Sequence, residues 1–424
     1  MNAPVLPLTL TGPPRTLSLA AAVSSFDRFA VSPMLVLIST DLGVPLSASI
    51  TAASGYYLAY GLTQPLWGVL SDRFGRVRVM RGALFGAALA GVVSALMPVL
   101  GALVVARVVT GACFGAVIPT ALTYVGDTVP TSVRQRALTD LMGAAALGTA
   151  AATGLGGVVA GLLDWRVAFT VPAACALVCA VLLRTLPEPP RARLGAQDRV
   201  GVAGPERARS GAQDRAAGGG TGVGGYLGAV LGHPWALLVF GLAFVEGAIL
   251  LGVLPFLAPA LEHTGLATAV AGLAITAYGL GLWLLSKLVK RLSGRWPTPV
   301  LMAVGGAQLC AGFALAAVHV SLPTVAVTAL LLGGGWSFLH SSLQTWATSV
   351  VPEARGTTIA FFASALFVGS AVSPWAAGPL AEQGRYALLF WLAAGAVVPL
   401  TAVAALTRRR YGALRTEGPQ PQPE

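Results

Sequence analysis

The chain has 424 residues, of which 55% are hydrophobic and only 10% are charged. Soluble globular proteins carry about 25% charged residues, so this composition excludes an ordinary soluble enzyme and indicates a protein built for lipid. The net charge of +11 does not indicate nucleic-acid binding, because the arginines occur in short stretches between apolar segments rather than on one basic domain.

Twelve apolar segments are long enough to cross a bilayer, since a spanning helix needs about 20 such residues. Six lie in the first half of the chain, near residues 17–39, 50–69, 79–99, 101–125, 138–161 and 166–184. Six more lie in the second half, near residues 234–258, 266–288, 299–318, 323–345, 357–380 and 386–407. We therefore predict an all-α membrane protein with twelve transmembrane helices.

The region between the two sets differs in composition. Residues 187–232 are rich in Pro, Gly, Ala and Arg, and the pentapeptide at 195–199 recurs at 211–215. Such a segment buries too little apolar surface to order itself, so we predict a flexible linker, with a docking site for a partner as the alternative. The predicted domains are 1–186 and 233–424, each with six helices, the second ending in a short tail.

The placement of basic residues predicts the orientation. All but four of the 27 lysines and arginines fall at the termini and in alternate loops, which share one side of the membrane. Arg166 and Arg385 lie on the other side, and Arg28 and Arg107 lie within predicted helices. By the positive-inside rule, both termini and the linker face the cytoplasm. Arg15 is the first basic residue, so a cleaved signal peptide is not expected.

The two halves repeat one another. The tetrapeptide at 59–62 recurs at 277–280, and Gly148, Gly157 and Phe169 recur at one constant separation as Gly369, Gly378 and Phe390. The repeat predicts two pseudo-symmetric six-helix bundles, with a substrate site between them near the middle of the membrane.

A charged stretch, G-V-L-S-D-R-F-G-R, joins the second and third apolar segments at residues 68–76. It resembles the loop between the second and third helices of major facilitator superfamily transporters, within which the chain most resembles the twelve-helix drug:proton antiporters. The resemblance implies a conformational gate that latches the outward-open state; its residues are Gly68, Asp72, Arg73, Gly75 and Arg76. An ordinary cytoplasmic loop that anchors the bilayer edge is the alternative.

Two acids lie at equivalent depths in the two halves. Asp27 is about ten residues into the first apolar segment and Glu246 is at a similar depth in the seventh. An ionisable side chain inside a membrane costs several kcal/mol, so it marks a transport pathway by default. Burial favours the protonated acid, which suits reversible proton binding. The alternative for Asp27 is a wet vestibule in which it only pairs with a neighbouring cation.

Arg107, Gly111 and Gly115 form a stripe on one helix face, and this pattern resembles the fourth-helix motif of the same superfamily. The resemblance implies that Arg107 takes part in proton transfer or in recognition of substrate charge; a cation that only bonds backbone carbonyls is the alternative. Arg28 points about 100° away from Asp27, and the sequence leaves its role open.

The fifth segment carries Gly148, Gly156 and Gly157, which resembles an antiporter signature, but Ala152-Thr153 stands where antiporters have Gly-Pro. Export and import therefore both stay open. The candidate residues of a substrate cavity are Tyr56, Tyr60, Gln64, His340 and Gln344. His340 and Gln344 share a helix face, where they contact either a substrate or a neighbouring helix.

No nucleotide-binding loop, H-E-x-x-H or G-x-S-x-G motif occurs, and the four cysteines lack metal-ligand spacing. We expect no enzyme activity, no metal and no cofactor, with a proton gradient as the energy source. The predicted function is proton-driven export of a small molecule by a monomer in the bacterial cytoplasmic membrane. The alternatives are a metabolite importer or facilitator on the same scaffold, and a transport-inactive sensor or scaffold.

Overall fold

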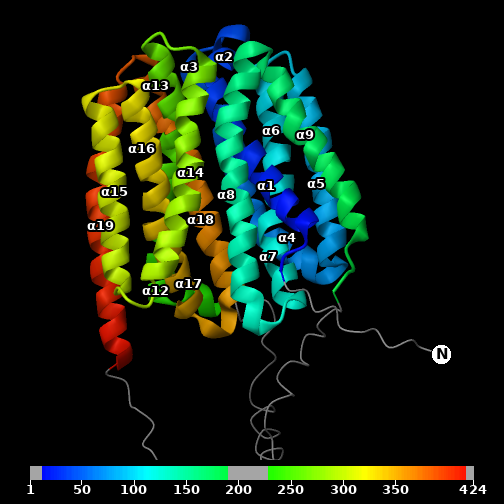
Figure 1. Cartoon of the computed structure of the whole chain (residues 1–424), viewed down its shortest axis with the longest axis vertical. Coiled ribbons are helices and arrows are strands. Elements are labelled where there is room, and N and C mark those ends of the chain that lie inside the picture. Colours follow the sequence, from blue (N-terminus) through cyan, green and yellow to red (C-terminus); the bar gives the residue numbers. More distant parts are fainter. Residues whose placement is uncertain (1–11, 190–227, 417–424) are drawn as a thin grey trace, which may run out of the picture.

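The computed structural model describes residues 12–189 and 228–416. Within these ranges the protein consists of helices that run roughly parallel to one long axis, and no strand occurs apart from an isolated bridge between Ser293 and Trp296 (Figure 1). The two described ends of the chain lie at the same end of the molecule (Figure 1).

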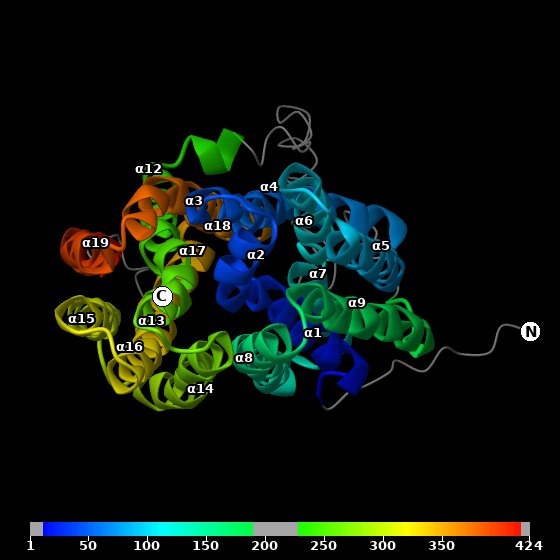
Figure 2. The same cartoon turned by 90° about the horizontal axis from the view of Figure 1, so that it is seen from above.

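The helices form two bundles that lie side by side when the molecule is seen from above (Figure 2). The first bundle contains α1 (Arg15–Ala30), η1 (Ser32–Met34), α2 (Leu35–Asp41), α3 (Leu46–Ser49), α4 (Thr51–Phe74), α5 (Arg76–Leu96), α6 (Leu100–Phe114), α7 (Val117–Thr128), α8 (Thr131–Leu162), α9 (Trp165–Leu182) and η2 (Leu183–Thr185). The second contains α12 (Pro234–Glu246), η4 (Gly247–Leu251), η5 (Leu254–Phe256), α13 (Leu257–His263), α14 (Thr268–Leu292), α15 (Thr298–Val318), α16 (Leu322–Gly335), η6 (Trp336–His340), α17 (Ser341–Val350), η7 (Pro352–Ala354), α18 (Arg355–Glu382) and α19 (Tyr386–Thr416).

Eleven helical rods among the described residues are long and apolar enough to cross a membrane. The twelfth predicted segment is α4, which has 24 residues but also carries three tyrosines and Gln64. This polarity has a structural reason, because α4 packs against α6 of its own bundle and α18 of the other. One of its faces therefore meets protein rather than lipid.

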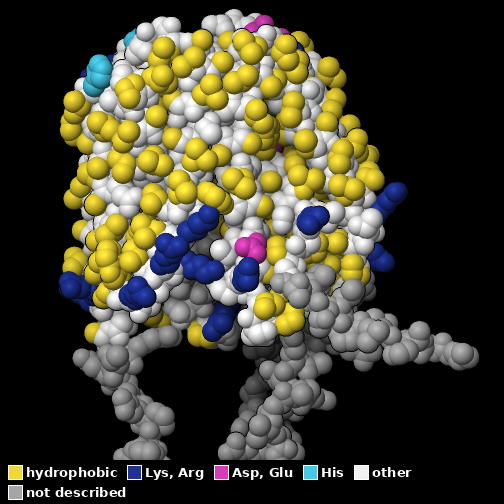
Figure 3. Space-filling model, viewed as in Figure 1, with side chains coloured by type: hydrophobic (Ala, Val, Ile, Leu, Met, Phe, Trp, Pro, Cys, Tyr) yellow, Lys and Arg dark blue, Asp and Glu magenta, His cyan; other side chains and the backbone are white. Residues whose placement is uncertain are grey.

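The outer surface shows the two environments that the sequence predicts. Large apolar side chains cover the upper and middle parts of the molecule in Figure 3, while lysines and arginines gather in its lower part. We call this lower part the basic end. Exposed apolar side chains on helices of both bundles include Leu66, Phe85, Leu89, Trp375 and Trp391. Their exposure is stable only in contact with lipid tails, so this is a multi-pass membrane protein.

Four rods are broken, and they occupy equivalent places in the two bundles. The first rod of each bundle breaks at a proline, Pro33 or Pro255, because proline cannot donate the backbone hydrogen bond that continues the helix. The fourth rod of the first bundle breaks between α6 and α7, at Gly115 and Ala116. The fourth rod of the second bundle passes through a π-helix, η6. Broken membrane helices commonly line a site.

Glycines bring helices of each bundle together at equivalent positions. A Cβ on Gly148 of α8 would collide with the backbone of Ala22 on α1, and a Cβ on Gly369 of α18 would collide with the backbone of Phe244 on α12. These are the glycines that the sequence repeat aligned. The duplicated sequence therefore builds duplicated packing.

The bundles meet along two seams, α4 with α18 and α8 with α14. They also meet at the end opposite the basic end, where η1 contacts η5 and α3 contacts α18. There the Ser47 hydroxyl donates to Glu382 Oε2 over 2.6 Å. At this end the two halves are joined.

The borders of the predicted linker lie within the described residues. The Tyr124 hydroxyl donates to the Pro187 carbonyl over 3.2 Å, and Val230 is fully buried. Pro187 and Val230, one at each border, therefore lie against other parts of the protein. The rest of the predicted linker, residues 190–227, lies outside the described residues.

Candidate functional site

Asp27 and Arg107 form a buried ion pair between α1 and α6. Arg107 Nη2 donates to Asp27 Oδ2 over 2.9 Å and Nη1 donates to Oδ1 over 3.1 Å, so the contact is bidentate. The two side chains are 1% and 0% exposed. The guanidinium also lies 4.6 Å from the Tyr56 ring centroid and 4.7 Å from that of Phe169. Asp27 therefore faces protein rather than a wet vestibule or lipid.

Glu246 and His340 form a second buried pair, between α12 and η6. His340 Nδ1 lies 2.9 Å from Glu246 Oε2, and the Glu246 side chain is fully buried. The Trp336 ring stacks on the imidazole at a centroid distance of 3.8 Å. Glu246 Oε1 has no hydrogen-bond partner among the described residues. His340 therefore contacts a neighbouring helix in this state.

The two pairs are equivalent in architecture. Each joins an acid on the first rod of a bundle to a base on the fourth rod, and all four of these rods are broken. The second pair adjoins two π-helical segments: η4 begins directly after Glu246, and η6 ends at His340. A π-helical turn is rare and frequently marks a functional position. Each acid is thus held within its own bundle, and Glu246 pairs with His340 rather than with Arg107.

The other predicted cavity residues divide into two groups. Tyr56, Tyr60 and Gln64 are buried on α4. Tyr60 contacts the Phe367 ring of α18 at a centroid distance of 4.6 Å, so it lies at the seam between the bundles. Gln344 is exposed, unlike His340 one turn earlier.

Arg28 lies next to Asp27 on α1 but does not share its partner. It is half-buried, and its Nη2 lies 3.4 Å from the Ser25 hydroxyl. No carboxylate of the described residues lies within ion-pair distance of it.

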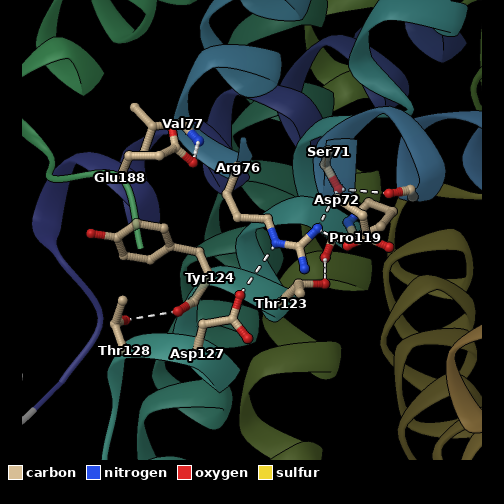
Figure 4. Close-up of polar contacts among 11 residues, drawn as sticks. Ser71, Asp72, Arg76, Val77, Pro119, Thr123, Tyr124, Asp127, Thr128 and Glu188 are labelled. Carbon is tan, nitrogen blue, oxygen red and sulfur yellow. Dashed lines mark hydrogen bonds and ion pairs between the residues drawn. The ribbon is translucent and has the colours of Figure 1, made fainter. Parts of the chain in front are cut away.

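The predicted gate forms a charged network at the basic end (Figure 4). Gly75 adopts φ +107°, which favours glycine, and its turn separates α4 from α5. Arg76 forms an ion pair with Asp72, and its Nε donates to Asp127 Oδ2 on α7 over 3.2 Å. Asp72 and Arg73 remain exposed. The network ties the loop to the fourth rod.

Gly68 lies near the end of α4, one turn before Asp72. A Cβ at this position would have no heavy atom within 4 Å, so no helix backbone approaches Gly68 closely in this state.

Sequence reasoning missed two acids at the same place. Asp127 completes the contact to Arg76. Glu188 accepts from the backbone N–H groups of Val77 and Arg78 over 3.1 and 3.2 Å, and so caps the positive end of α5. Asp127 lies three residues before Pro130 and Glu188 directly follows Pro187, so both lie where a helical segment ends, and this position was the available signal.

The sequence is similar to known transporters. The sequence matches the profile of the Major Facilitator Superfamily over residues 17–264 and 239–423. It is 34% identical over 190 residues to a triacylglyceride transporter of Mycolicibacterium hassiacum, covering 44% of this chain and 35% of the relative. It is 32% identical over 164 residues to the puromycin resistance protein of Streptomyces alboniger, covering 38% of this chain and 32% of the relative. The chain thus matches about a third of the length of these relatives.

The fold also matches solved structures. A D-xylose-proton symporter superimposes with a TM-score of 0.74 at 16% identity, covering 92% of this chain and 96% of that one. At this identity the likeness concerns the fold. The family profile covers nearly the whole chain, and the arrangement of two six-rod bundles agrees with it. This chain belongs to the major facilitator superfamily.

Proposed function

We propose that the protein is a secondary transporter that exports a small molecule in exchange for protons by alternating access. The observation that carries this proposal is the Asp27–Arg107 pair, an ionisable acid with 1% exposure held by an arginine on a different broken rod. An arginine stays charged in proteins, so the acid is the member of this pair that can take up a proton.

Protonation of Asp27 would remove the charge that Arg107 binds. The bidentate contact would then weaken, leaving α1 and α6 free to separate. A substrate group that binds either member of the pair would compete with the same contact. Proton and substrate would therefore exclude each other, which is the requirement for antiport.

Glu246 and His340 supply a second position at which a proton can bind. Histidine changes charge in the physiological pH range, and a carboxylate 2.9 Å away is its natural proton partner. This pair lies in the second bundle. A proton bound there would change the contact between α12 and η6, as protonation of Asp27 changes the contact between α1 and α6.

The positive-inside rule supports a cytoplasmic position for the basic end. The contacts of η1 with η5 and of α3 with α18 then close the outer side, so this state would load substrate from the cytoplasm. Asp72 pairs with Arg76 in this state but is 62% exposed, so it can exchange this partner for one on the other bundle once the inner side closes. That movement is the proposed action of the gate.

The relatives' names fit export of organic compounds. One relative is a puromycin resistance protein and another is a triacylglyceride transporter. A proton-coupled importer is the second candidate, because a D-xylose-proton symporter shares the fold.

Everted membrane vesicles test both candidates. The chain is produced in an efflux-deficient bacterial host, which is screened for growth on a panel of toxic compounds. Vesicles are then acidified inside by respiration and followed with a pH-sensitive dye. An antiporter dissipates the gradient when a protecting compound is added, and Asp27→Asn abolishes this response while the exposed-acid control Asp140→Asn retains it.

Two outcomes would contradict the proposal. If the compound enters right-side-out vesicles down an imposed proton gradient, the protein is an importer. If Asp27→Asn keeps the full pH response, proton coupling does not use Asp27.

A further inference from the structure

Arg28 is a membrane-embedded cation for which the mechanism above has no use. Its neighbour Asp27 is occupied by Arg107, and no other carboxylate of the described residues lies within 4.0 Å of its nitrogens. Its one hydrogen bond, to the Ser25 hydroxyl, is long at 3.4 Å. Its Nε is buried and has no hydrogen-bond partner in the described part of the chain. The guanidinium therefore has unused donor capacity.

Aromatic rings from both bundles surround this guanidinium. Its central carbon lies 5.0 Å from the ring centroid of Phe29, 5.3 Å from that of Tyr60 and 5.4 Å from that of Phe367. Phe29 and Tyr60 belong to the first bundle and Phe367 belongs to the second. Arg28 is thus at the junction of the halves, where a substrate in an alternating-access cycle has to bind.

A second unused donor lies beside this cage. Tyr278 of α14 packs its ring against Phe29 at a centroid distance of 5.8 Å. Its hydroxyl is buried and has no partner among the described residues. Arg28 Nε on α1 and the Tyr278 hydroxyl on α14 are therefore two donors without partners among the described residues, and both side chains lie beside the Phe29 ring.

Donors without acceptors in a membrane interior require an acceptor from outside the chain. A planar guanidinium matches the two oxygens of a carboxylate, and it does so better than a point charge because its N–H groups form a fixed fork. The surrounding rings favour a flat apolar body, which they can contact face to face or edge to face. Cation–π contacts stabilise Arg28 only weakly compared with an ionic hydrogen bond, so they leave the site open to an anion.

We propose that Arg28 binds the anionic group of the transported molecule, so that the substrate class is an organic carboxylate, or an anion of like geometry, with an aromatic or flat apolar body. This inference deepens the proposed function and rests on it for the word substrate. The binding step itself requires no proton gradient. A phospholipid phosphate would present similar chemistry, and the test separates the two.

Three probes of nearly equal shape and different charge test the charge preference: 2-naphthoate, 2-naphthamide and 2-naphthylmethylammonium. Binding of each to the purified full chain in detergent is measured by calorimetry or by quenching of tryptophan fluorescence. We expect naphthoate to bind about tenfold more tightly than naphthamide, and the ammonium probe to bind most weakly. Phosphatidylglycerol is added as a competitor in a separate arm.

Two substitutions separate recognition from structure. Arg28→Gln should bring the naphthoate-to-naphthamide ratio to about one, while Arg28→Lys should retain part of the preference because it keeps the charge without the fork. Arg385→Gln removes an exposed arginine at the end opposite the basic end, so it should leave the naphthoate-to-naphthamide ratio unchanged. A merely structural Arg28 would weaken all three probes equally.

Several results would overturn the inference. The inference is contradicted if the wild-type protein binds naphthamide or the ammonium probe as tightly as naphthoate. This test needs no variant, so it holds even if Arg28→Gln folds poorly. Binding of phosphatidylglycerol without binding of naphthoate contradicts the substrate assignment. Failure of proton antiport in vesicles, with naphthoate binding intact, would instead sink the proposed function alone.

Discussion

The two bundles place an acid and a base at the same positions but use different chemistry. In the first bundle the Asp27 and Arg107 side chains meet through two hydrogen bonds, and both are almost fully buried. In the second, Glu246 meets His340 through one contact, and its other oxygen has no partner in the described part of the chain. A duplicated backbone has thus kept its geometry while its charged side chains diverged.

This difference separates the roles that the two pairs can play. Arginine stays charged at every physiological pH, so the first pair opens only when the acid is protonated or its contact is displaced. In the second pair both the acid and the base can take up or release a proton, so this pair can change its charge without the loss of a permanent cation. We infer that the Asp27–Arg107 pair holds α1 and α6 together until it is broken, and we call it the lock. The Glu246–His340 pair changes its charge with pH, and we call it the sensor.

The largest expected effect is that of removing the Asp27–Arg107 ion pair, the lock. Asp27→Asn leaves Arg107 buried without a counter-charge, and breaking such a pair costs about 3–5 kcal/mol of unfolding free energy. Glu246→Gln should cost less, about 1–3 kcal/mol, because His340 can become neutral. Thermal unfolding of the detergent-solubilised chain measures both.

A double variant is the control for this pair. Asp27→Asn combined with Arg107→Gln should recover part of the lost stability, because no charge is left unpaired, yet it should not recover proton coupling. Equal stability losses for Asp27→Asn and Glu246→Gln would contradict the division into lock and sensor.

The next effect tests whether the scaffolds are truly alike. Gly148→Ala and Gly369→Ala each force a methyl group against a helix backbone, so each should cost about 1–3 kcal/mol and the two costs should agree. The controls are Gly143→Ala, whose Cβ has its nearest neighbour at 3.9 Å, and Gly395→Ala, whose Cβ has none within 4 Å. Unfolding of each variant in detergent gives the comparison, and clearly unequal losses at Gly148 and Gly369 would show that packing has diverged as well.

Sequence patterns pointed to three of the four residues in the two pairs, because the two halves of the chain repeat one another. The equal depth of Asp27 and Glu246 in the two halves identified both acids, and the stripe of Arg107, Gly111 and Gly115 identified the base of the first bundle. Their burial is expected from the sequence, because a charged side chain within an apolar segment is stable only when protein groups shield it from lipid.

Patterns did not predict the pairing in the second bundle or the burial along one helix face. The contact of Glu246 with His340 joins residues 94 positions apart, and no local spacing encodes it. His340 and Gln344 share a face, but burial depends on which helices stand opposite, so one is buried and the other exposed. The sequence predicted residues 50–69 as an apolar segment, and α4 occupies this range although it is not among the eleven rods apolar enough to cross a membrane.

The sensor is tested by its pH response. His340→Gln keeps a hydrogen-bonding group near Glu246 but cannot change charge, so it should cost only about 1 kcal/mol of unfolding free energy. Transport by this variant should depend less on pH, because glutamine cannot take up a proton. Vesicle assays at a series of external pH values measure the profile. An unchanged profile in His340→Gln would assign the pH response to Asp27 alone.

The smallest expected effect concerns the charged loop, which the second half repeats only in part. In the first bundle Arg76 bonds Asp127 across to the fourth rod, whereas the corresponding stretch of the second, residues 287–295, has lysines and arginines but no acid. Asp127→Asn should cost under about 1 kcal/mol, since the side chain is 40% exposed, and should slow turnover by about two- to fivefold with KM unchanged. Asp140→Asn, an exposed acid with no such contact, is the matched control. A rise in KM with normal turnover would show that Asp127 serves binding and not the movement between states.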